Sequence, residues 1–337
     1  MKLEDKCLRF GGFLVAAAVV LRLLSGGLGQ QILSALTSPQ AAAVFLYLET
    51  GRVVRPAPAP VETIPATEPT DAPATVPPEA PPALPVFAPE DTALVAVNSL
   101  CSYDVDIPAM LKTPLTWDLT GGEPAVLILH SHATESYTKK EDYQETSPYR
   151  TLSTDHNMVS VGAQIAAMLE DAGIGVIHDT TLHDYPSYNS SYINSRGRVA
   201  ELLEQYPTVK LVLDLHRDAG DTSGKQPRYT VDTPEGTAAQ VMMVVGTDAG
   251  GRNHPAWREN MALAVKLHAR LEQNIPGICR PISLRSDRFN QDLSPGAMLI
   301  EVGAAGNTRQ EALAAATFLA QGIIDLARGC VTEDFAS

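Results

Sequence analysis

Cysteine is scarce in this chain of 337 residues, which contains only four, at positions 7, 101, 279 and 330. No two of them form a C-x-x-C pair, the spacing that zinc ribbons and thiol redox motifs use. Cys7 precedes an apolar segment and is expected on its cytosolic side, which leaves an odd set of three. The sequence therefore predicts neither a cysteine-based zinc site nor a disulfide framework.

Basic side chains are also few. The chain has 25 Lys and Arg against 39 Asp and Glu, a formal net charge of -14. A general nucleic-acid-binding protein needs a basic surface that neutralises phosphates. The charge balance therefore argues against nucleic acid as a partner and is typical of an acidic, solvated surface. We find no internal repeat.

The N-terminal residues 1–29 are expected to form a cytosolic tip and a transmembrane signal-anchor. Lys2, Lys6 and Arg9 precede an apolar run over residues 10–28, and positive charge on this side of a span favours the cytoplasm. Arg22 interrupts the run, although an arginine near a helix end can extend to the membrane interface. No A-x-A-like cleavage site follows in the expected place, which favours an uncleaved anchor.

Residues 30–99 are expected to form an extracytoplasmic spacer. Twelve of the 25 prolines lie between Pro56 and Pro89, mixed with Ala, Thr and Glu. Such a composition has too little apolar surface for a core and gives an extended, semi-rigid chain. The predicted organisation is thus an anchor, a proline-rich spacer and a folded domain over residues 100–332. It places the domain outside the cytoplasm, attached to the cell membrane.

In the folded domain, short apolar runs alternate with segments of helical periodicity. The predicted strands cover residues 125–130, 174–180, 209–216, 239–246 and 297–303. The predicted helices cover residues 158–173, 195–207, 255–277 and 309–329. Alternating strands and helices predict an α/β fold with a mostly parallel sheet and helices on both faces.

Imidazole and carboxylate side chains occur at the ends of three predicted strands. The first strand leads into His130, His132 and Glu135, the third into His216, and the last carries Glu301. Sites in open α/β sheets form at the carboxyl ends of the strands. These side chains converge if the three strands are neighbours, and a metal site is then expected.

Zinc is the candidate metal, because it binds imidazole nitrogen and carboxylate oxygen and keeps one open position in catalytic sites. His132, Glu135 and His216 supply two histidines and one carboxylate. Glu301 could take a proton from the attacking water and return it to a leaving amine. The alternative role for Glu301 is that of a buried carboxylate with satisfied hydrogen bonds.

The sequence leaves open which histidine of the first motif binds the metal. On an extended strand His130 and His132 point to the same side. The H-x-x-E spacing from His132 to Glu135 resembles that of zinc carboxypeptidases, which favours His132 as the ligand. His130 would then have a catalytic role, orienting a ligand or contacting substrate. The reverse assignment remains possible.

Six stretches of the folded domain resemble the stage II sporulation protein P family of endospore-forming bacteria. They are HSHATESY (130–137), DHNMVSVG (155–162), VIHDTTLHDYPSYNSSY (176–192), LVLDLHRDA (211–219), RFNQDLSPGAMLIEVG (288–303) and GNT (306–308). The resemblance implies a membrane-anchored cell-wall hydrolase related to zinc N-acetylmuramoyl-L-alanine amidases. The late catalytic glutamate of those amidases corresponds to Glu301 and their middle zinc histidine to His216.

One departure from the amidase pattern concerns the carboxylate ligand. The related amidases carry this glutamate later, at the start of the next helix, where the present chain has Asp155 and His156. The ligand is therefore either Glu135 or a residue near Asp155. The resemblance also implies cleavage of peptidoglycan during forespore engulfment, in the intermembrane space or septum, by an amidase that can also cut peptide cross-links as an endopeptidase. It implies stage II sporulation proteins D and M as partners.

Three further residues are candidates for substrate binding. Arg217 could hold a stem-peptide carboxylate with a bidentate contact, or it could instead pair with Asp214 or Asp218. Asn290 and Gln291 precede the last predicted strand and could bind peptide amides.

The tyrosines of the DYPSYNSSY segment could line the substrate groove or simply pack within their loop. His178 and His183 have no partner at metal-ligand spacing.

Two other functions fit the same residues. The H-x-x-E spacing permits a zinc peptidase that acts on wall peptides only. A non-catalytic wall-binding module is the second alternative, and a full zinc set together with Glu301 argues against it.

Overall fold

The computed structural model describes residues 87–113, 115, 119, 121–219 and 226–330. The chain divides into two compact units, Met1–Glu79 and Ala80–Ser337, and every described residue belongs to the second. The predicted anchor and most of the predicted spacer lie outside the described residues. Within the described part, no helix combines the length and apolar character needed to cross a membrane.

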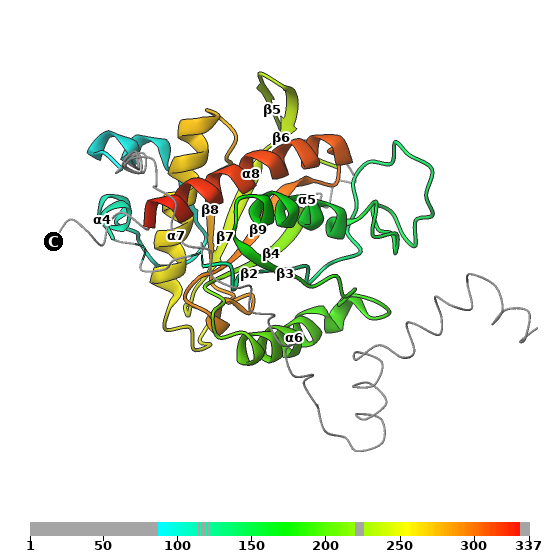
Figure 1. Ribbon diagram of the computed structural model, residues 1–337, viewed down its shortest axis with the longest axis horizontal. Helices are drawn as coiled ribbons and strands as arrows, with labels where there is room; N and C mark the ends of the chain where they lie inside the picture. Colours follow the sequence, from blue (N-terminus) through cyan, green and yellow to red (C-terminus); the bar gives the residue numbers. More distant parts are fainter. Residues whose placement is uncertain (1–86, 114, 116–118, 120, 220–225, 331–337) are drawn as a thin grey trace, which may run out of the picture. The chain divides into compact units, whose positions relative to one another are not determined.

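A seven-stranded sheet forms the centre of the second unit (Figure 1). Across the sheet the strands are β1 (Val97–Ser99), β8 (Ile282–Arg285), β7 (Val241–Gly246), β9 (Ala297–Ala304), β4 (Leu211–Asp218), β2 (Pro124–Leu129) and β3 (Gly175–His178). Neighbouring strands of this sheet run parallel except at β7 and β9. The sheet thus has two parallel blocks, β1-β8-β7 and β9-β4-β2-β3, that run in opposite directions.

Helices connect the strands. The α-helices are α4 (Ile107–Lys112), α5 (Met158–Asp171), α6 (Ser191–Gln205), α7 (Trp257–Asn274) and α8 (Arg309–Cys330). Short 3-10 helices are η1 (Pro89–Leu94), η2 (Tyr188–Ser190) and η3 (Gln291–Leu293), and a separate hairpin is formed by β5 (Thr230–Thr233) and β6 (Gly236–Ala239).

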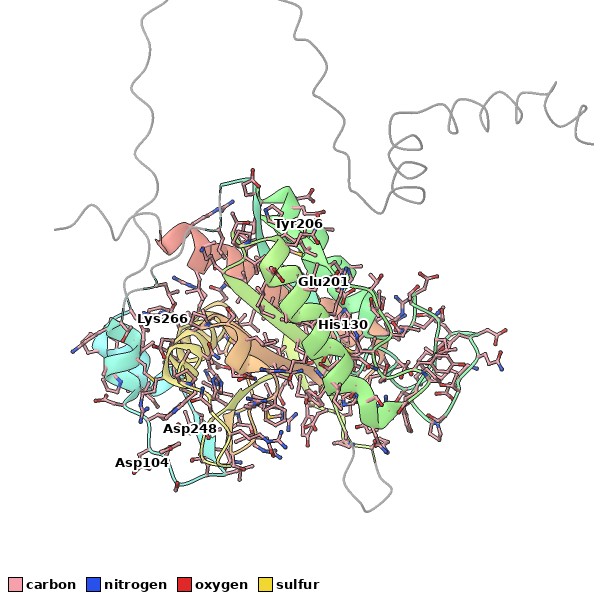
Figure 2. The ribbon with its side chains drawn as sticks, turned by 90° about the horizontal axis from the view of Figure 1, so that it is seen from below. Asp104, His130, Glu201, Tyr206, Asp248 and Lys266 are labelled. Atoms are coloured by element: carbon pink, nitrogen blue, oxygen red, sulfur yellow. The ribbon has the colours of Figure 1, made fainter. Side chains whose placement is uncertain are left out.

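The alternation of apolar side chains along β2 shows that the sheet is covered on both faces. Val126 and Ile128 join the larger hydrophobic core, to which α5, α7 and α8 contribute. Leu127 and Leu129 point to the opposite face, where they pack with Val199 and other residues of α6. In Figure 2, where Glu201 marks α6 and Tyr206 its C-terminal end, this helix lies over one face of the sheet. Burial of both faces explains why β2 reads as a continuous apolar run.

Both ends of α5 follow from its sequence. The Asn157 side chain accepts a hydrogen bond from the backbone N–H of Val159, so it caps the first turn. At the other end Gly173 has φ of 84°, and the N–H of Ile174 donates to the carbonyl of Leu169. Such a left-handed residue ends a helix and favours glycine. These caps hold α5 in place over β2 and β3.

The α/β fold with a mostly parallel sheet is confirmed, but four features differ from the sequence-based expectation. The antiparallel step between β7 and β9 and the β5–β6 hairpin were not expected. Strand β8 was also missed, because its four residues are too few to show a period. Finally, β1 pairs with β8 from Val97 onward, so the folded part begins before residue 100.

Candidate functional site

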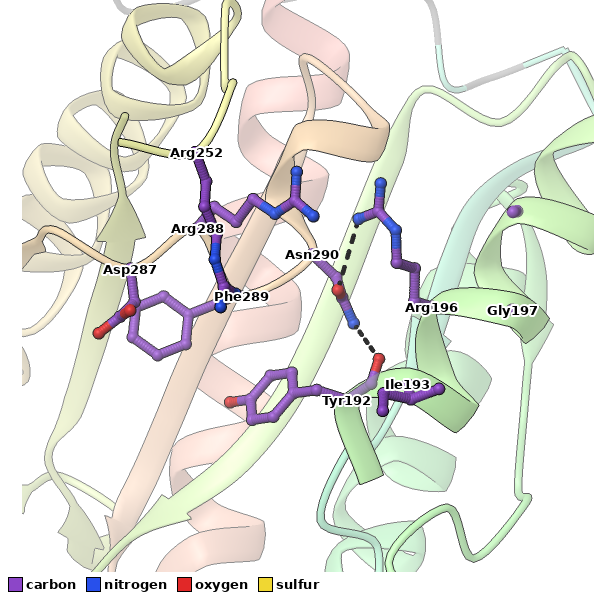
Figure 3. Close-up of a pocket in the computed structure, with 10 residues that line it drawn as sticks. Tyr192, Ile193, Arg196, Gly197, Arg252, Asp287, Arg288, Phe289 and Asn290 are labelled. Carbon is purple, nitrogen blue, oxygen red and sulfur yellow. Dashed lines mark hydrogen bonds between the residues drawn. The ribbon is translucent and has the colours of Figure 1, made fainter. Parts of the chain in front are cut away.

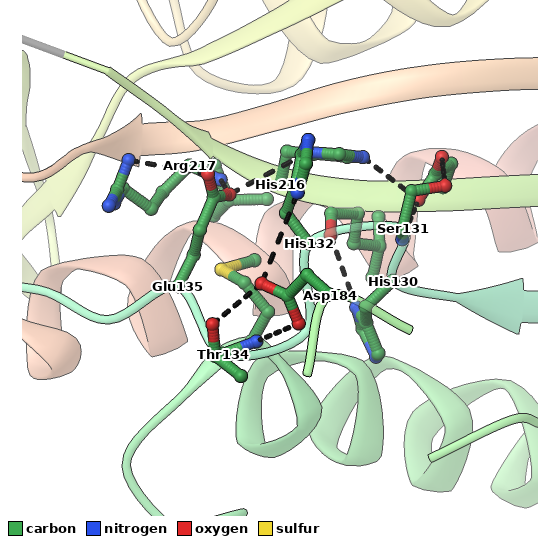
Figure 4. Close-up of polar contacts among 12 residues, drawn as sticks. His130, Ser131, His132, Thr134, Glu135, Asp184, His216 and Arg217 are labelled. Atoms are coloured by element: carbon green, nitrogen blue, oxygen red, sulfur yellow. Dashed lines mark hydrogen bonds and ion pairs between the residues drawn. The ribbon is translucent and has the colours of Figure 1, made fainter. Parts of the chain in front are cut away.

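The three strands that carry the predicted site residues are neighbours in the sheet, in the order β9-β4-β2. His216 of β4 is the register partner of Glu301 of β9, so both side chains lie at the same level of adjacent strands. His132 and Glu135 follow the carboxyl end of β2. The structure thus brings His132, Glu135 and His216 together (Figure 4).

His216 lies between two carboxylates. Its Nε2 atom is 2.9 Å from Oδ1 of Asp214, and its Nδ1 atom is 3.6 Å from Oε2 of Glu135. Burial alone would lower the pKa of His216, but Asp214 and then Glu135 outweigh burial and hold it well above its ordinary value. Asp214 is itself fixed by two hydrogen bonds from Ser131, one from the backbone N–H and one from the hydroxyl. The ring is thereby oriented with Nδ1 facing Glu135.

Glu135 is a buried carboxylate held by two arginines. Its Oε1 atom lies 3.2 Å from Arg150 and 3.4 Å from Arg217, and the backbone N–H of Arg217 donates to Oε2. Burial would raise the pKa of Glu135, but Arg217 and His216 outweigh burial and lower it to about 2. This side chain is therefore an anion at neutral pH, a requirement for a metal ligand.

His132 is enclosed by aromatic rings. It stacks on Tyr188 with 4.4 Å between ring centroids, and it meets Tyr192 and His216 edge-on at 5.5 and 5.3 Å. Burial lowers the pKa of His132, which favours the neutral imidazole. Its Nδ1 atom is buried without a hydrogen-bond partner and lies 3.9 Å from Oδ2 of Asp184. An unpartnered buried nitrogen in a native site calls for an explanation, such as an ion.

Two imidazoles and one carboxylate, from His132, His216 and Glu135, are ligand types that zinc binds. Among the described residues, no group of three His, Cys, Asp or Glu side chains is arranged to hold a metal ion. Glu135 Oε2 and His216 Nδ1 nevertheless lie 3.6 Å apart, close to the separation of about 3.4 Å that two ligands of a tetrahedral zinc ion adopt. Glu135 and His216 therefore match zinc in spacing. The third donor, Nδ1 of His132, has no hydrogen-bond partner and matches zinc in its chemistry.

Glu301 has the properties of a proton carrier. Its Oε2 atom is buried and has no hydrogen-bond partner. Burial raises the pKa of Glu301 to about 8, against the opposing effect of His216 and with a further increase from Glu135. A carboxyl group whose pKa lies near neutrality can both take up and release a proton. The unpartnered oxygen does not fit the alternative of a buried carboxylate with satisfied hydrogen bonds.

His130 points away from this cluster. Its Nδ1 atom is 3.1 Å from the Leu215 carbonyl, and its Nε2 atom is 2.9 Å from Nε2 of His178, beneath α5. Burial, with His178 beside it, lowers the pKa of His130 to about 3. The expectation that His130 and His132 share one side was wrong because β2 ends at Leu129 and the chain then turns.

The candidate substrate residues have different surroundings. Arg217 is buried, and its ion-pair partner is Glu135 rather than Asp214 or Asp218. Gln291 is also buried, where its amide bonds the backbone of β7. Asn290 donates to the carbonyl of Tyr192 and lines a cavity beside the site.

The alternative carboxylate position lies on the turn before α5. Asp155 is exposed there, and His156 stacks on Tyr143 and lies 3.1 Å from Glu141. Of the two candidate positions for the ligand, the structure places Glu135 beside His216.

Sequence reasoning missed three residues of the site. Asp214 had a signal, because it stands two positions before His216 on one strand and therefore on the same side. Arg150 binds Glu135 and Asp184, and its guanidinium lies 4.6 Å from the ring centre of Tyr188. Arg150 and Asp184 lie in irregular segments far from the strand motifs, and no periodic pattern could have indicated them.

Several solved structures are similar to this chain. The N-acetylmuramoyl-L-alanine amidase AmiC2 of Nostoc punctiforme has 16% identity and a TM-score of 0.38, covering 61% of this chain and 98% of that one. The CwlD amidase from Clostridioides difficile, solved in complex with the GerS lipoprotein, has 13% identity and a TM-score of 0.36, covering 62% of this chain and 97% of that one.

A sequence relative is the stage II sporulation protein P of Bacillus subtilis (strain 168), 29% identical over 204 residues. The match covers 57% of this chain and 48% of the relative, so the chain spans about half the length of that protein. The sequence model of the family "Stage II sporulation protein P (SpoIIP)" matches residues 76–324, which include every residue of the site described above. The chain therefore belongs to the stage II sporulation protein P family.

Proposed function

We propose that this protein is a zinc-dependent peptidoglycan hydrolase that cleaves the amide between N-acetylmuramic acid and L-alanine. The observation that carries the proposal is the convergence of His132 and Glu135, which follow β2, with His216 of the adjacent strand β4, beside the Oε2 atom of Glu301 that has no hydrogen-bond partner. The family resemblance of the strand-end motifs supports this substrate.

His132, Glu135 and His216 would hold the zinc ion. Zinc in such a site supplies a Lewis acid that polarises the scissile carbonyl and makes hydroxide available near neutral pH. Asp214 fixes the ring of His216 from the far side, and partners of this kind are important for metal affinity. Arg217 and Arg150 hold Glu135 in its anionic form.

Glu301 would carry the proton. Its Oε2 atom accepts a proton from the attacking water as the oxygen adds to the carbonyl carbon. The carbon–nitrogen bond then breaks, and the same carboxyl group gives the proton to the leaving amine of L-alanine. The products are a muramoyl carboxylate and a free stem peptide. Burial raises the pKa of Glu301 to about 8, so both the ionised form that accepts the proton and the protonated form that donates it are populated close to neutral pH.

The setting of this activity is part of the proposal. Residues 1–29 would anchor the protein in the cell membrane with the folded domain extracytoplasmic, and the enzyme would act on the wall during engulfment with stage II sporulation proteins D and M. Cleavage of peptide cross-links at the same site is a second activity that this chemistry permits.

Product analysis tests the proposal. The full-length chain is incubated with purified muropeptides and zinc, and the products are identified by mass spectrometry. Release of stem peptides that begin with L-alanine is expected. Cleavage within the peptide alone would identify a wall peptidase instead, and no cleavage by metal-loaded protein would indicate a binding module.

A further inference from the structure

A cavity of about 650 Å³ adjoins the candidate site, between α6 and the loop that leads into η3 (Figure 3). Tyr192 belongs to both: its ring lines the cavity and also stacks on His216, with 6.4 Å between centroids. Phe289 also lines the cavity, and its ring centroid lies 6.2 Å from that of Tyr192. A ligand in this cavity would therefore lie one aromatic ring away from the proposed catalytic residues.

The cavity is cationic although the chain as a whole carries a net charge of -14. Arg196, Arg252 and Arg288 line it, together with Asp287. Arg196 and Arg288 share the carboxylate of Asp292, at 2.8 and 3.1 Å, and Figure 3 shows their guanidinium groups pointing toward one another. The charges of these three arginines exceed those of Asp287 and Asp292 by one, so the group has a net positive charge. Arg252 is exposed and has no ion pair or hydrogen bond with any described residue.

Two backbone features stand out in the cavity wall. Gly197 lies inside α6, where glycine is less stable than alanine, yet a Cβ atom added there would meet no atom within 4 Å. Phe289 has φ of 49°, a left-handed conformation that is an outlier for a bulky side chain. Strained residues of this kind occur at ligand-binding positions. The exposed surface at Gly197 and the ring of Phe289, which line the same cavity, both suit a bound chain.

We propose that this cavity is a substrate subsite that binds a carboxylate-bearing stretch of the stem peptide. Arg252 pairs with a peptide carboxylate, Phe289 and Tyr192 contact the short aliphatic side chains, and Gly197 leaves room for the backbone. The subsite positions the peptide so that its N-terminal amide reaches Glu301. This inference rests on the proposed function and specifies which part of the substrate is recognised.

Charge reversal tests the arginine. The full-length chain and its Arg252→Glu variant are assayed on a disaccharide peptide with free stem-peptide carboxyl groups, and on the same compound with those groups amidated. Arg252→Glu is expected to raise KM for the free acid roughly tenfold or more, since hydrogen bonds between charged groups are the strong ones. Its kcat should stay near normal, and KM for the amidated compound should change little. Arg328→Glu on α8 is the matched control with the same change in net charge.

A larger side chain at position 197 tests the glycine. Gly197→Leu should raise KM for both compounds without loss of thermal stability, because the added side chain enters open space. Gly329→Leu on α8, where an added Cβ also meets no atom within 4 Å, is the control and should leave KM unchanged. Normal KM for Gly197→Leu, or an equal change on both compounds for Arg252→Glu, would overturn the subsite.

A binding measurement separates this inference from the proposed function. Calorimetry of the uncleaved free-acid compound on Glu301→Gln, with and without Arg252→Glu, does not depend on turnover. If the double variant binds the free-acid compound more weakly but binds the amidated compound normally, the subsite is supported even if the wild-type chain cleaves nothing. Equal binding by the two variants overturns the subsite even if the wild-type chain is an active amidase.

Discussion

His130 and His132 stand two residues apart at the end of β2, and their surroundings are opposite. On the α5 side, His130 is fully buried, with a backbone carbonyl and His178 as partners of its two nitrogens. On the other side, His132 lies beside His216 among aromatic rings, and its Nδ1 has no hydrogen-bond partner. Both ring nitrogens of His130 therefore have partners within the protein, whereas Nδ1 of His132 is available to bind a metal ion.

The turn after Leu129, rather than the spacing of the two histidines, decides their roles. An extended chain would have put both rings on one face. Because the strand ends first, one ring enters the α5 core and the other enters the charged cluster. Variants on each side can test whether metal chemistry belongs to one side only.

The largest expected effect separates the two histidines directly. His132→Ala should lose bound zinc and wall-cleaving activity, because it removes a proposed ligand. His130→Ala should keep about one zinc per chain but lose about 2 kcal/mol or more of stability, because it leaves a cavity and an unpartnered His178. Metal analysis and thermal unfolding on the same preparations measure both. Zinc loss in His130→Ala with retention in His132→Ala would reverse the assignment.

Glu301→Gln tests the proton carrier on the His132 side. Glutamine preserves the shape but cannot accept a proton, so turnover should fall by about 10² to 10⁴. Zinc content and melting temperature should remain near those of the wild type, since Glu301 is not a proposed ligand. Near-normal turnover would exclude this role. A structural glutamate would show the reverse pattern, with lower stability and full activity in the folded fraction.

Much of the fold could be predicted because its helices and buried strands are long and regular. The helix predicted over 158–173 is observed as α5 (Met158–Asp171), and the strand predicted over 297–303 as β9 (Ala297–Ala304). The sequence could not show that β7 runs antiparallel to β9, since strand direction depends on the connections and not on the pattern within a strand. The hairpin over Thr230–Ala239 was missed because it lies largely outside the core.

The site was predictable where it lies on strands and not where it lies in loops. Parallel neighbours bring strand-end residues together, so His216 and Glu301 could be expected to converge. The position of Arg150 depends on the long segment between β2 and α5, whose path is set by side-chain contacts such as that between Arg309 and Glu141. No periodicity describes such contacts, and Arg150 therefore became visible only in the structure.

Asp214→Asn should weaken zinc binding without removing a ligand. The carboxylate lies 2.9 Å from Nε2 of His216, and loss of such a partner lowers metal affinity or activity about 10- to 100-fold. Competition with a chelator measures the affinity. Asp179→Asn, which removes a carboxylate bonded to His183 instead, is the control and should leave zinc affinity unchanged. Unchanged affinity in Asp214→Asn would show that the His216 ring is oriented by other contacts.

Gly162→Ala tests the α5 side alone. A Cβ atom at this position would lie 2.6 Å from Nε2 of both His130 and His178, so the two rings must shift. Such overpacking costs about 1–3 kcal/mol, and denaturant unfolding should show it. Zinc content and turnover of the folded fraction should be unchanged, because neither ring belongs to the proposed metal site. Loss of zinc here would show that the two sides are coupled.

The smallest expected effect is on the pH dependence of stability, and it concerns His178. Burial lowers the pKa of His178 in the folded protein, so below about pH 6.5 the unfolded chain takes up a proton that the folded chain resists. Stability should therefore fall as the pH decreases, by at most about 1.4 kcal/mol per pH unit from this group. His178→Gln removes the titration, and the free energy of unfolding of this variant should vary less between pH 7 and pH 5 than that of the wild type. Both proteins are measured in chelator, so that protonation of the proposed ligands contributes equally to each. Parallel pH profiles would mean that the pKa of His178 is the same in the folded and unfolded states. The idea that burial keeps His178 neutral beneath α5 would then be wrong.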